Sequence, residues 1–234
     1  MIKMKFTSFA SSSKGNCYLV EAEGHKILIE LGISWKKIML HLGFMTSTVE
    51  FALISHQHGD HSFAVKEALQ TGIDVWTSKE TADALGVADH HRINFLQAGV
   101  EQKIGPWTVL PFDLVHDVPC LGFLIAYKDE LLLFVPDTGY VPNRFRGVTI
   151  LAIECNFAED ILSKNILNGS LPAVVGHRIR RNHLSLEVLI EMLHSNNFSQ
   201  CQQVYLLHLS DGNSDEARMI KEVEMATGIP TRAA

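Results

Sequence analysis

The chain has 234 residues and a formal net charge of −6, with 47% hydrophobic and 20% charged residues. This length suits one domain with a sizeable core, and the composition excludes a disordered or fibrous chain. The sequence has no run of 18 apolar residues and no apolar leader after Met1, so we expect a cytoplasmic protein without a membrane anchor. The acidic balance argues against a large non-specific nucleic-acid surface, since Lys and Arg dominate phosphate binding, although a local one remains possible.

Short apolar runs alternate with helical patterns along the whole sequence. We find no repeat or linker, so we predict a single domain over residues 1–234 without an inserted second domain. Alternation and apolar runs predict strands at Lys3–Ala10, Tyr18–Ala22, Lys26–Leu31, Phe51–Ser55, Asp74–Thr77, Trp107–Val115, Gly122–Tyr127, Leu131–Pro136, Thr149–Glu154 and Gln203–Leu207. Helical periodicity, in several cases after a Ser, Thr or Asp cap, predicts helices at Trp35–Leu42, Ser62–Thr71, Lys79–Leu85, Leu184–Ser195 and Asp215–Thr227.

Polar side chains follow the predicted strands where their apolar runs stop. The residues in question are His56, His116, Asp137, Glu154 and His208. Ligands held at the ends of rigid strands can be aimed at one shared cleft, as a metal site requires. We therefore expect these strand ends to converge on one rim.

The segment His56-Gln57-His58-Gly59-Asp60-His61 carries the densest set of metal ligands in the chain. Imidazoles two residues apart point the same way along an extended segment, while Asp60 and His61 begin the next helix and turn towards a neighbouring point. A divalent metal needs three or four such ligands, so distant residues must complete the set. The candidates are His116, Asp137 and His208. The four cysteines (Cys17, Cys120, Cys155 and Cys201) have no paired spacing, which favours buried reduced thiols over disulfides or sulfur-ligated zinc.

These residues resemble the motifs of the metallo-β-lactamase superfamily, in the same order along nearly the whole chain. The resemblance implies a four-layered αββα sandwich with two divalent metal ions, Zn²⁺ or Mn²⁺. Carried over, it places the first metal on His56, His58 and His116, the second on Asp60, His61 and His208, and Asp137 between them. One departure is Glu30 in Ile29-Glu30-Leu31-Gly32, where the superfamily usually has an Asp that supports the metal-binding turn.

Two metal ions can activate a water and clamp a phosphoryl or carbonyl oxygen, which indicates hydrolysis without choosing the substrate. Glu154 and His183 bear on that choice, because an acid beside a histidine can fix its tautomer and make it a proton donor to a leaving oxygen. Phosphodiesterases of the superfamily similarly place an acid and a histidine motif between the bridging Asp and the last ligand.

Within the superfamily, five segments look like the YycJ/WalJ-like exonuclease group. They are Ser11-Ser12-Ser13-Lys14-Gly15-Asn16, His116-Asp117-Val118-Pro119, Asp137-Thr138-Gly139-Tyr140, Asn182-His183-Leu184-Ser185 and His208-Leu209-Ser210. The resemblance implies catalytic roles for Asp60, Glu154 and His183. The β-CASP domain of related nucleases is missing, since no spare block of residues separates the motifs.

A basic run directly precedes His183 and is the main candidate for substrate contact. It contains Arg178, Arg180 and Arg181, and guanidinium groups bind phosphate oxygens in bidentate fashion. Taken alone, the run would fit an ordinary solvated face. Lys14 and Asn156 are weaker candidates, since a plain turn and a structural hydrogen bond explain them as well.

The sequence thus predicts a two-metal nuclease that acts on nucleic acid, in particular an exonuclease acting on DNA with metal-bound hydroxide as the nucleophile. One alternative is a small-molecule metallohydrolase that opens a cyclic nucleotide, lactone or thioester. Another is a metal-bearing regulatory protein without turnover. The native metal, the polarity of digestion and the oligomeric state are left open.

Overall fold

The computed structural model describes residues 4–234, so Lys3 of the first predicted strand lies outside the described residues. The chain divides into two compact units, Met1–Phe112 and Asp113–Ala234. Each unit is described by itself below. The expectation of a single domain over the whole chain remains a prediction.

The first unit contains a six-stranded sheet with the strand order β1-β2-β3-β4-β5-β6. The pairs β1–β2 and β2–β3 are antiparallel, whereas β3, β4, β5 and β6 run parallel to one another. The strands are β1 (Met4–Ser12), β2 (Gly15–Ala22), β3 (His25–Ile29), β4 (Phe51–Leu53), β5 (Asp74–Ser78) and β6 (Ile93–Leu96).

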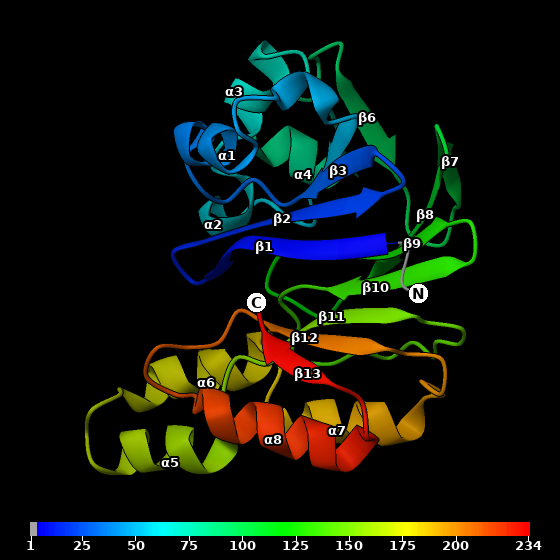
Figure 1. Cartoon of the computed structure of the whole chain (residues 1–234). Helices are drawn as coiled ribbons and strands as arrows, with labels where there is room; N and C mark the ends of the chain where they lie inside the picture. Colours follow the sequence, from blue (N-terminus) through cyan, green and yellow to red (C-terminus); the bar gives the residue numbers. More distant parts are fainter. Residues whose placement is uncertain (1–3) are drawn as a thin grey trace. The chain divides into compact units, whose positions relative to one another are not determined.

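Helices α1 to α4 lie on one side of this sheet (Figure 1). They bury apolar side chains such as Ile38, Val65 and Ala82 against Leu28 and Ala52 of the sheet, so the core of the unit lies between the helices and the sheet. The bounds are α1 (Trp35–His41), η1 (Thr46–Thr48), α2 (Gly59–Ser62), α3 (Val65–Gln70) and α4 (Lys79–Ala84), followed by the antiparallel hairpin strands β7 (Gln102–Ile104) and β8 (Trp107–Asp113).

In the second unit the strands follow the order β13-β12-β11-β10-β9. Strand β9 is antiparallel to β10, and β10 to β13 run parallel. Helices α5 to α8 gather on one side of these strands (Figure 1). The strands are β9 (Leu121–Tyr127), β10 (Glu130–Val135), β11 (Ile150–Glu154), β12 (Gln203–Leu207) and β13 (Thr231–Ala233), and the helices are α5 (Glu159–Leu167), α6 (Ala173–Asn182), α7 (Leu186–Ser195) and α8 (Glu216–Thr227).

Parallel strands bring the predicted strand-end residues together within each unit. Because β10, β11 and β12 are parallel neighbours, Asp137, Glu154 and His208 all lie at the carboxyl edge of these strands. In the first unit, Glu30 and His56 follow the parallel neighbours β3 and β4. The predicted convergence therefore holds inside each unit, while a single rim shared by all the strands remains a prediction.

The structure corrects several predicted elements. The predicted helix Ser62–Thr71 is replaced by two short helices, α2 and α3, and the helix expected from Leu184 begins at Leu186, because the Ser185 side chain caps it by accepting from Val188 N. Six elements were not predicted: β6, β7, β13, η1, α5 and α6. The strands among them are three or four residues long, too short for a periodic pattern.

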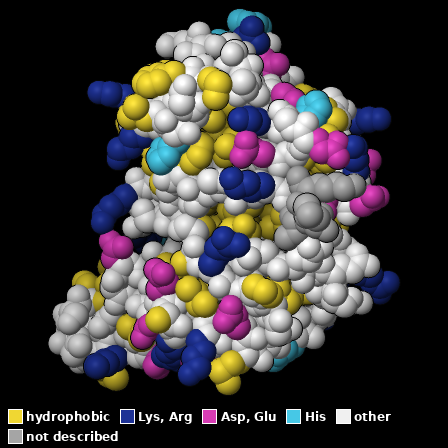
Figure 2. Space-filling model, in the orientation of Figure 1, with side chains coloured by type: hydrophobic (Ala, Val, Ile, Leu, Met, Phe, Trp, Pro, Cys, Tyr) yellow, Lys and Arg dark blue, Asp and Glu magenta, His cyan; other side chains and the backbone are white. Residues whose placement is uncertain are grey.

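Charged side chains of both signs are interspersed on the face shown in Figure 2. Among the described residues, none of the helices combines the length and apolar character needed to cross a membrane.

Candidate metal centre

The predicted metal-binding turn lies in the first unit between β4 and α3. His56 is fully buried, and its Nδ1 lies 2.8 Å from Ser55 Oγ. The rings of His58 and His61 have their centroids 4.7 and 4.2 Å from that of His56. The one-turn helix α2 carries Asp60 and His61, with His61 Nε2 3.5 Å from Asp60 Oδ2. The hexapeptide thus places three imidazoles and a carboxylate together within this unit.

Glu30, which directly follows β3, contacts this turn. Glu30 is fully buried, and its Oε1 accepts a hydrogen bond from Ser55 N at 3.3 Å and lies 3.6 Å from His61 Nδ1. Burial raises the pKa of the Glu30 carboxyl, and the neighbouring His61 acts in the opposite direction. Glu30 therefore holds and orients a ligand residue, as the Asp usual in the superfamily was expected to do.

Gly32 is required by the close approach of α2 to the segment after β3. A Cβ at this position would lie 1.7 Å from the Asp60 carbonyl oxygen. Leu31 N donates to His61 O and Ala64 N donates to Leu31 O, each at 2.8 Å. The absence of a side chain at Gly32 thus lets the backbone clamp both ends of the ligand-bearing helix.

Asn16, at the start of β2, contacts the predicted metal-binding turn. Its side chain is buried, and its Nδ2 lies 3.2 Å from both Asp60 O and His61 Nε2. The amide is held in this orientation because its Oδ1 accepts from Ser12 N and from the Tyr18 hydroxyl. Its place in the segment Ser11-Ser12-Ser13-Lys14-Gly15-Asn16, one of the five that resemble the exonuclease group, is the feature of the sequence that points to it.

In the second unit, Glu154 connects the predicted proton donor to a predicted metal ligand. This fully buried carboxylate has Oε1 2.7 Å from His183 Nδ1 and 3.0 Å from His208 Nδ1. Its Oε2 accepts from Thr138 N at 2.9 Å and Leu184 N at 3.0 Å. Both carboxylate oxygens are therefore engaged, and the two imidazoles are held by the same residue.

Asp137 and His208 complete this group. His208 Nδ1 lies 3.0 Å from Asp137 Oδ1 as well as from Glu154. The four residues Asp137, Glu154, His183 and His208 offer ligand atoms that all lie within 4.8 Å of one another. This cluster is able to bind a metal ion.

The surroundings of His183 and the direction of its pKa shift suit a proton donor. Burial lowers its pKa, but the charge of Glu154 and the hydrogen bond to it, together with Asp137, outweigh that effect and raise the pKa above its ordinary value. Its side chain keeps 22% of its surface exposed. An imidazole that is held at Nδ1, has a raised pKa and stays partly exposed is suited to protonate a leaving oxygen.

His116 is held by the carboxyl-terminal end of α6. Its Nδ1 donates to the Asn182 carbonyl at 2.9 Å, and its Nε2 lies 3.2 Å from Asp117 Oδ1. Burial lowers the pKa of His116 more than Asp137 and the hydrogen bond to Asn182 raise it. The neutral imidazole that metals require is therefore favoured.

The donor set fits divalent metal ions. In His56 and His208, Nδ1 lies next to a group of the same unit, an arrangement in which a histidine would coordinate a metal ion through Nε2. Metal-binding histidines commonly show this arrangement. The remaining donors are carboxylates, and a set made of nitrogen and oxygen suits Zn²⁺ and Mn²⁺.

The predicted substrate contacts differ in how they are placed. Arg178 and Arg181 are exposed on α6 and form no ion pair among the described residues. Arg180 is bonded to Glu159 through Nε at 3.0 Å, and its Nη2 donates to Ser163. The contribution of the three arginines to substrate binding remains a prediction.

The two weaker candidates lie in ordinary structural positions. Lys14 is exposed at the turn between β1 and β2, where its backbone N donates to Ser12 Oγ. Asn156 is buried and donates from Nδ2 to His208 O at 2.9 Å, so it supports a metal ligand. Their role in substrate binding also stays a prediction.

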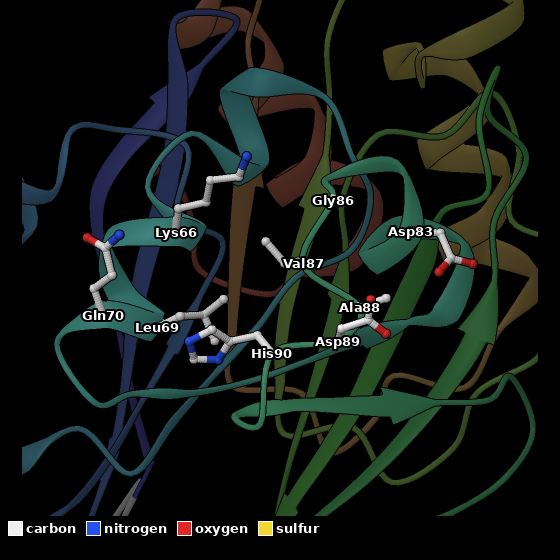
Figure 3. Close-up of a pocket in the computed structure, with 9 residues that line it drawn as sticks. All are labelled: Lys66, Leu69, Gln70, Asp83, Gly86, Val87, Ala88, Asp89 and His90. Carbon is white, nitrogen blue, oxygen red and sulfur yellow. The ribbon is translucent and has the colours of Figure 1, made fainter.

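The first unit also contains an open pocket with a volume of about 570 Å³ (Figure 3). It is lined by residues of α3, by Asp83 of α4 and by the turn formed by residues 86–90. None of the predicted ligands or substrate contacts lines this pocket.

Comparison with known proteins identifies the family to which the chain is similar. A family model described as Metallo-beta-lactamase superfamily matches residues 13–149. The chain is 29% identical over 230 residues to exodeoxyribonuclease WalJ of Streptococcus pneumoniae, covering 91% of this chain and 84% of that protein. It is 25% identical over 229 residues to exodeoxyribonuclease YycJ of Bacillus anthracis, covering 92% of this chain and 87% of the relative.

A solved structure has the same fold. The metallo-beta-lactamase fold protein YhfI from Bacillus subtilis superposes with a TM-score of 0.77 at 15% identity, over 99% of this chain and 96% of that one. At this identity the likeness concerns the fold alone, and it confirms the predicted fold class.

Proposed function

Because the chain belongs to the metallo-β-lactamase superfamily and is a hydrolase with its αββα fold, we propose that it is a two-metal exonuclease acting on DNA. The observation that carries the proposal is the pairing of His183 with Glu154 at 2.7 Å. Hydrolysis of a phosphodiester requires a proton for the leaving alkoxide, and this pair places a donor beside a metal-binding cluster. The similarity to the exodeoxyribonucleases WalJ and YycJ over most of the chain supports the choice of DNA.

The proposed metal ligands are the seven residues of the sequence prediction. His56, His58 and His116 would hold one metal and Asp60, His61 and His208 the other, with Asp137 shared, as the superfamily resemblance implies. When bound, the two ions supply an activated water and neutralise the charge of the phosphate. Zn²⁺ and Mn²⁺ are both compatible with these donors.

The residues around the ligands perform the remaining tasks. Glu154 holds His183 by Nδ1, so that its other nitrogen can donate a proton to the leaving oxygen. Arg181, exposed at the end of α6, is available for the phosphates of the strand. Glu30 and Asn16 keep His61 in one orientation.

The proposed function is tested by cleavage of labelled single- and double-stranded DNA and RNA by the protein loaded with Zn²⁺, Mn²⁺ or Mg²⁺. We expect stepwise release of nucleotides from DNA ends, abolished by Asp60→Ala. Intact DNA together with opening of a lactone or thioester would contradict the proposal. Absence of any turnover by the metal-loaded protein would instead favour the regulatory alternative.

A second experiment separates the proton donor from the metal site. His183→Ala is expected to slow DNA cleavage by about 100-fold or more, in the range for loss of a general acid. Hydrolysis of thymidine 5′-(p-nitrophenyl phosphate) should fall much less, because p-nitrophenolate leaves without a proton. Metal content, measured in parallel, should stay unchanged. An equal loss on both substrates would show that His183 does not act as the proton donor.

A further inference from the structure

The loop that follows β10 carries Tyr140 and is anchored firmly by Thr138. The Thr138 hydroxyl lies 2.8 Å from Tyr140 O and 3.2 Å from Val115 O, and it accepts from Val115 N at 3.1 Å. Thr138 N donates to Glu154, and Gly139 N donates to Val115 O at 2.8 Å. The position of Tyr140 is therefore tied to the residues that hold Asp137, His116 and His183.

The same loop packs on the carboxyl-terminal end of α6. A Cβ at Gly139 would lie 2.2 Å from the Arg181 carbonyl oxygen and 3.7 Å from Asn182 N. Gly139 thus lets the loop touch the helix backbone directly beside His183. Tyr140, Arg181 and Asn182 consequently belong to one small region of the second unit.

This region exposes an aromatic ring and a cation. The Tyr140 side chain is 56% exposed, although its backbone is held by hydrogen bonds, and neighbouring Val115 is 48% exposed. Arg181 is also exposed. An exposed aromatic ring and an exposed guanidinium in one region are the groups with which proteins bind single-stranded nucleic acid, by base stacking and phosphate contact.

Asn182 provides a second and independent indication of a ligand. Its side chain is 5% exposed, and its buried Oδ1 has no hydrogen-bond partner among the described residues. The backbone carbonyl of the same residue is engaged by His116. A buried amide oxygen without a partner is costly, so this oxygen is suited to accept a hydrogen bond from a bound molecule.

We propose that Tyr140, Arg181 and Asn182 form a subsite for an unpaired terminal nucleotide of DNA. The Tyr140 ring stacks on the base, Arg181 binds a phosphate, and Asn182 Oδ1 accepts a hydrogen bond from the nucleotide. Stacking on Tyr140 requires a base that has left the duplex, so the subsite selects single-stranded or frayed ends. This inference rests on the proposed function and specifies its substrate.

The test measures binding of metal-loaded full-length protein to a labelled phosphorothioate single strand, by fluorescence anisotropy. A second strand has abasic residues at both ends. We expect Tyr140→Ala to weaken binding of the normal strand roughly 5- to 100-fold, the range for loss of one stacked base, and to leave binding of the abasic-ended strand unchanged. Tyr140→Phe should retain binding, and Met225→Ala, which removes another exposed hydrophobic side chain, serves as the matched control. Equal weakening on both strands, or none, would overturn the proposal.

Asn182→Leu tests the buried amide with a second readout. If the unpaired oxygen serves the ligand, the variant should unfold at an equal or higher temperature than the wild type, because the change removes an unsatisfied polar group. Binding of the normal strand should nevertheless weaken. A lower unfolding temperature with unchanged binding would assign Asn182 a purely structural role and remove it from the subsite.

The two proposals fail in different ways. If the wild type cleaves DNA while Tyr140→Ala binds both strands as the wild type does, the subsite is wrong and the exonuclease proposal stands. If the wild type cleaves no DNA under any metal, the exonuclease proposal is wrong. If this wild type also binds both strands equally, the subsite proposal is wrong as well.

Discussion

At the scale of single residues, the metal site uses strained backbone at two of its supports. Glu30 and His208 both have positive φ values, 62° and 54°, which residues with a side chain seldom adopt. Such conformations cost of order 1–3 kcal/mol each and persist where the surroundings enforce them. Here Glu30 is enforced by Ser55 and His61, and His208 by Glu154.

Gly32→Ala should destabilise the protein and disturb the metal turn. The added Cβ would lie 1.7 Å from the backbone oxygen of Asp60, which cannot move aside without shifting α2. We expect a loss of at least about 1–3 kcal/mol in the free energy of unfolding, the range for overpacking, together with reduced metal content. Denaturant unfolding and elemental analysis measure the two effects.

Gly59→Ala is the matched control for this substitution. Gly59 is the first residue of α2, the helix that Gly32 approaches, and a Cβ added at Gly59 would meet nothing within 4 Å. The variant should therefore unfold like the wild type. Equal behaviour of the two variants would show that the close approach at Gly32 is not what holds the turn.

At the scale of elements, the arginines of α6 differ in their surroundings. Arg180 faces α5 and pairs with Glu159. The hydrogen bond between them lowers the pKa of the Glu159 carboxyl and raises the pKa of the Arg180 guanidinium. Arg178 and Arg181 remain exposed. In the sequence the three residues form one undivided basic run, and only the packing of α5 against α6 separates them.

Arg181→Ala should weaken binding of single-stranded DNA and lower its salt dependence. Loss of one phosphate contact reduces the slope of log K against log salt concentration by about 0.7 for single strands. Arg180→Ala, the matched comparison, should change this slope less because its guanidinium is already paired with Glu159. Titrations at several salt concentrations measure both. A larger change for Arg180 would show that its ion pair opens to receive DNA.

At the scale of the whole molecule, the proposed ligands come from both compact units of the chain. The turn of residues 56–61 belongs to the first unit, and His116, Asp137 and His208 belong to the second. Ligands that bind only the folded state stabilise it by mass action. Metal loading should therefore link the stability of the chain to the integrity of both sets of residues.

Removal of the metals by a chelator should lower the unfolding temperature, and Zn²⁺ or Mn²⁺ should restore it. His56→Ala and Asp137→Ala should each reduce metal content below the about two ions expected for a two-metal site, and each should diminish the restored stability. Scanning calorimetry with elemental analysis provides the measurement. If chelation left both the unfolding temperature and the metal content of the wild type unchanged, the proposed ligand set would be wrong.

The superfamily was predictable from the sequence because its motifs are short-range patterns, and the ligand residues assigned from them stay a prediction. The spacing of His56 to His61 and the polar residues at strand ends are visible within a few positions. By contrast, the bond between Glu154 and His183 joins residues 29 positions apart, and that between Asn16 and His61 joins residues 45 apart. Such contacts depend on which strands and helices become neighbours. The tertiary structure alone therefore decided how Glu30 reaches the metal turn, which arginines of α6 stay exposed, and that the loop of Tyr140 packs on the end of α6.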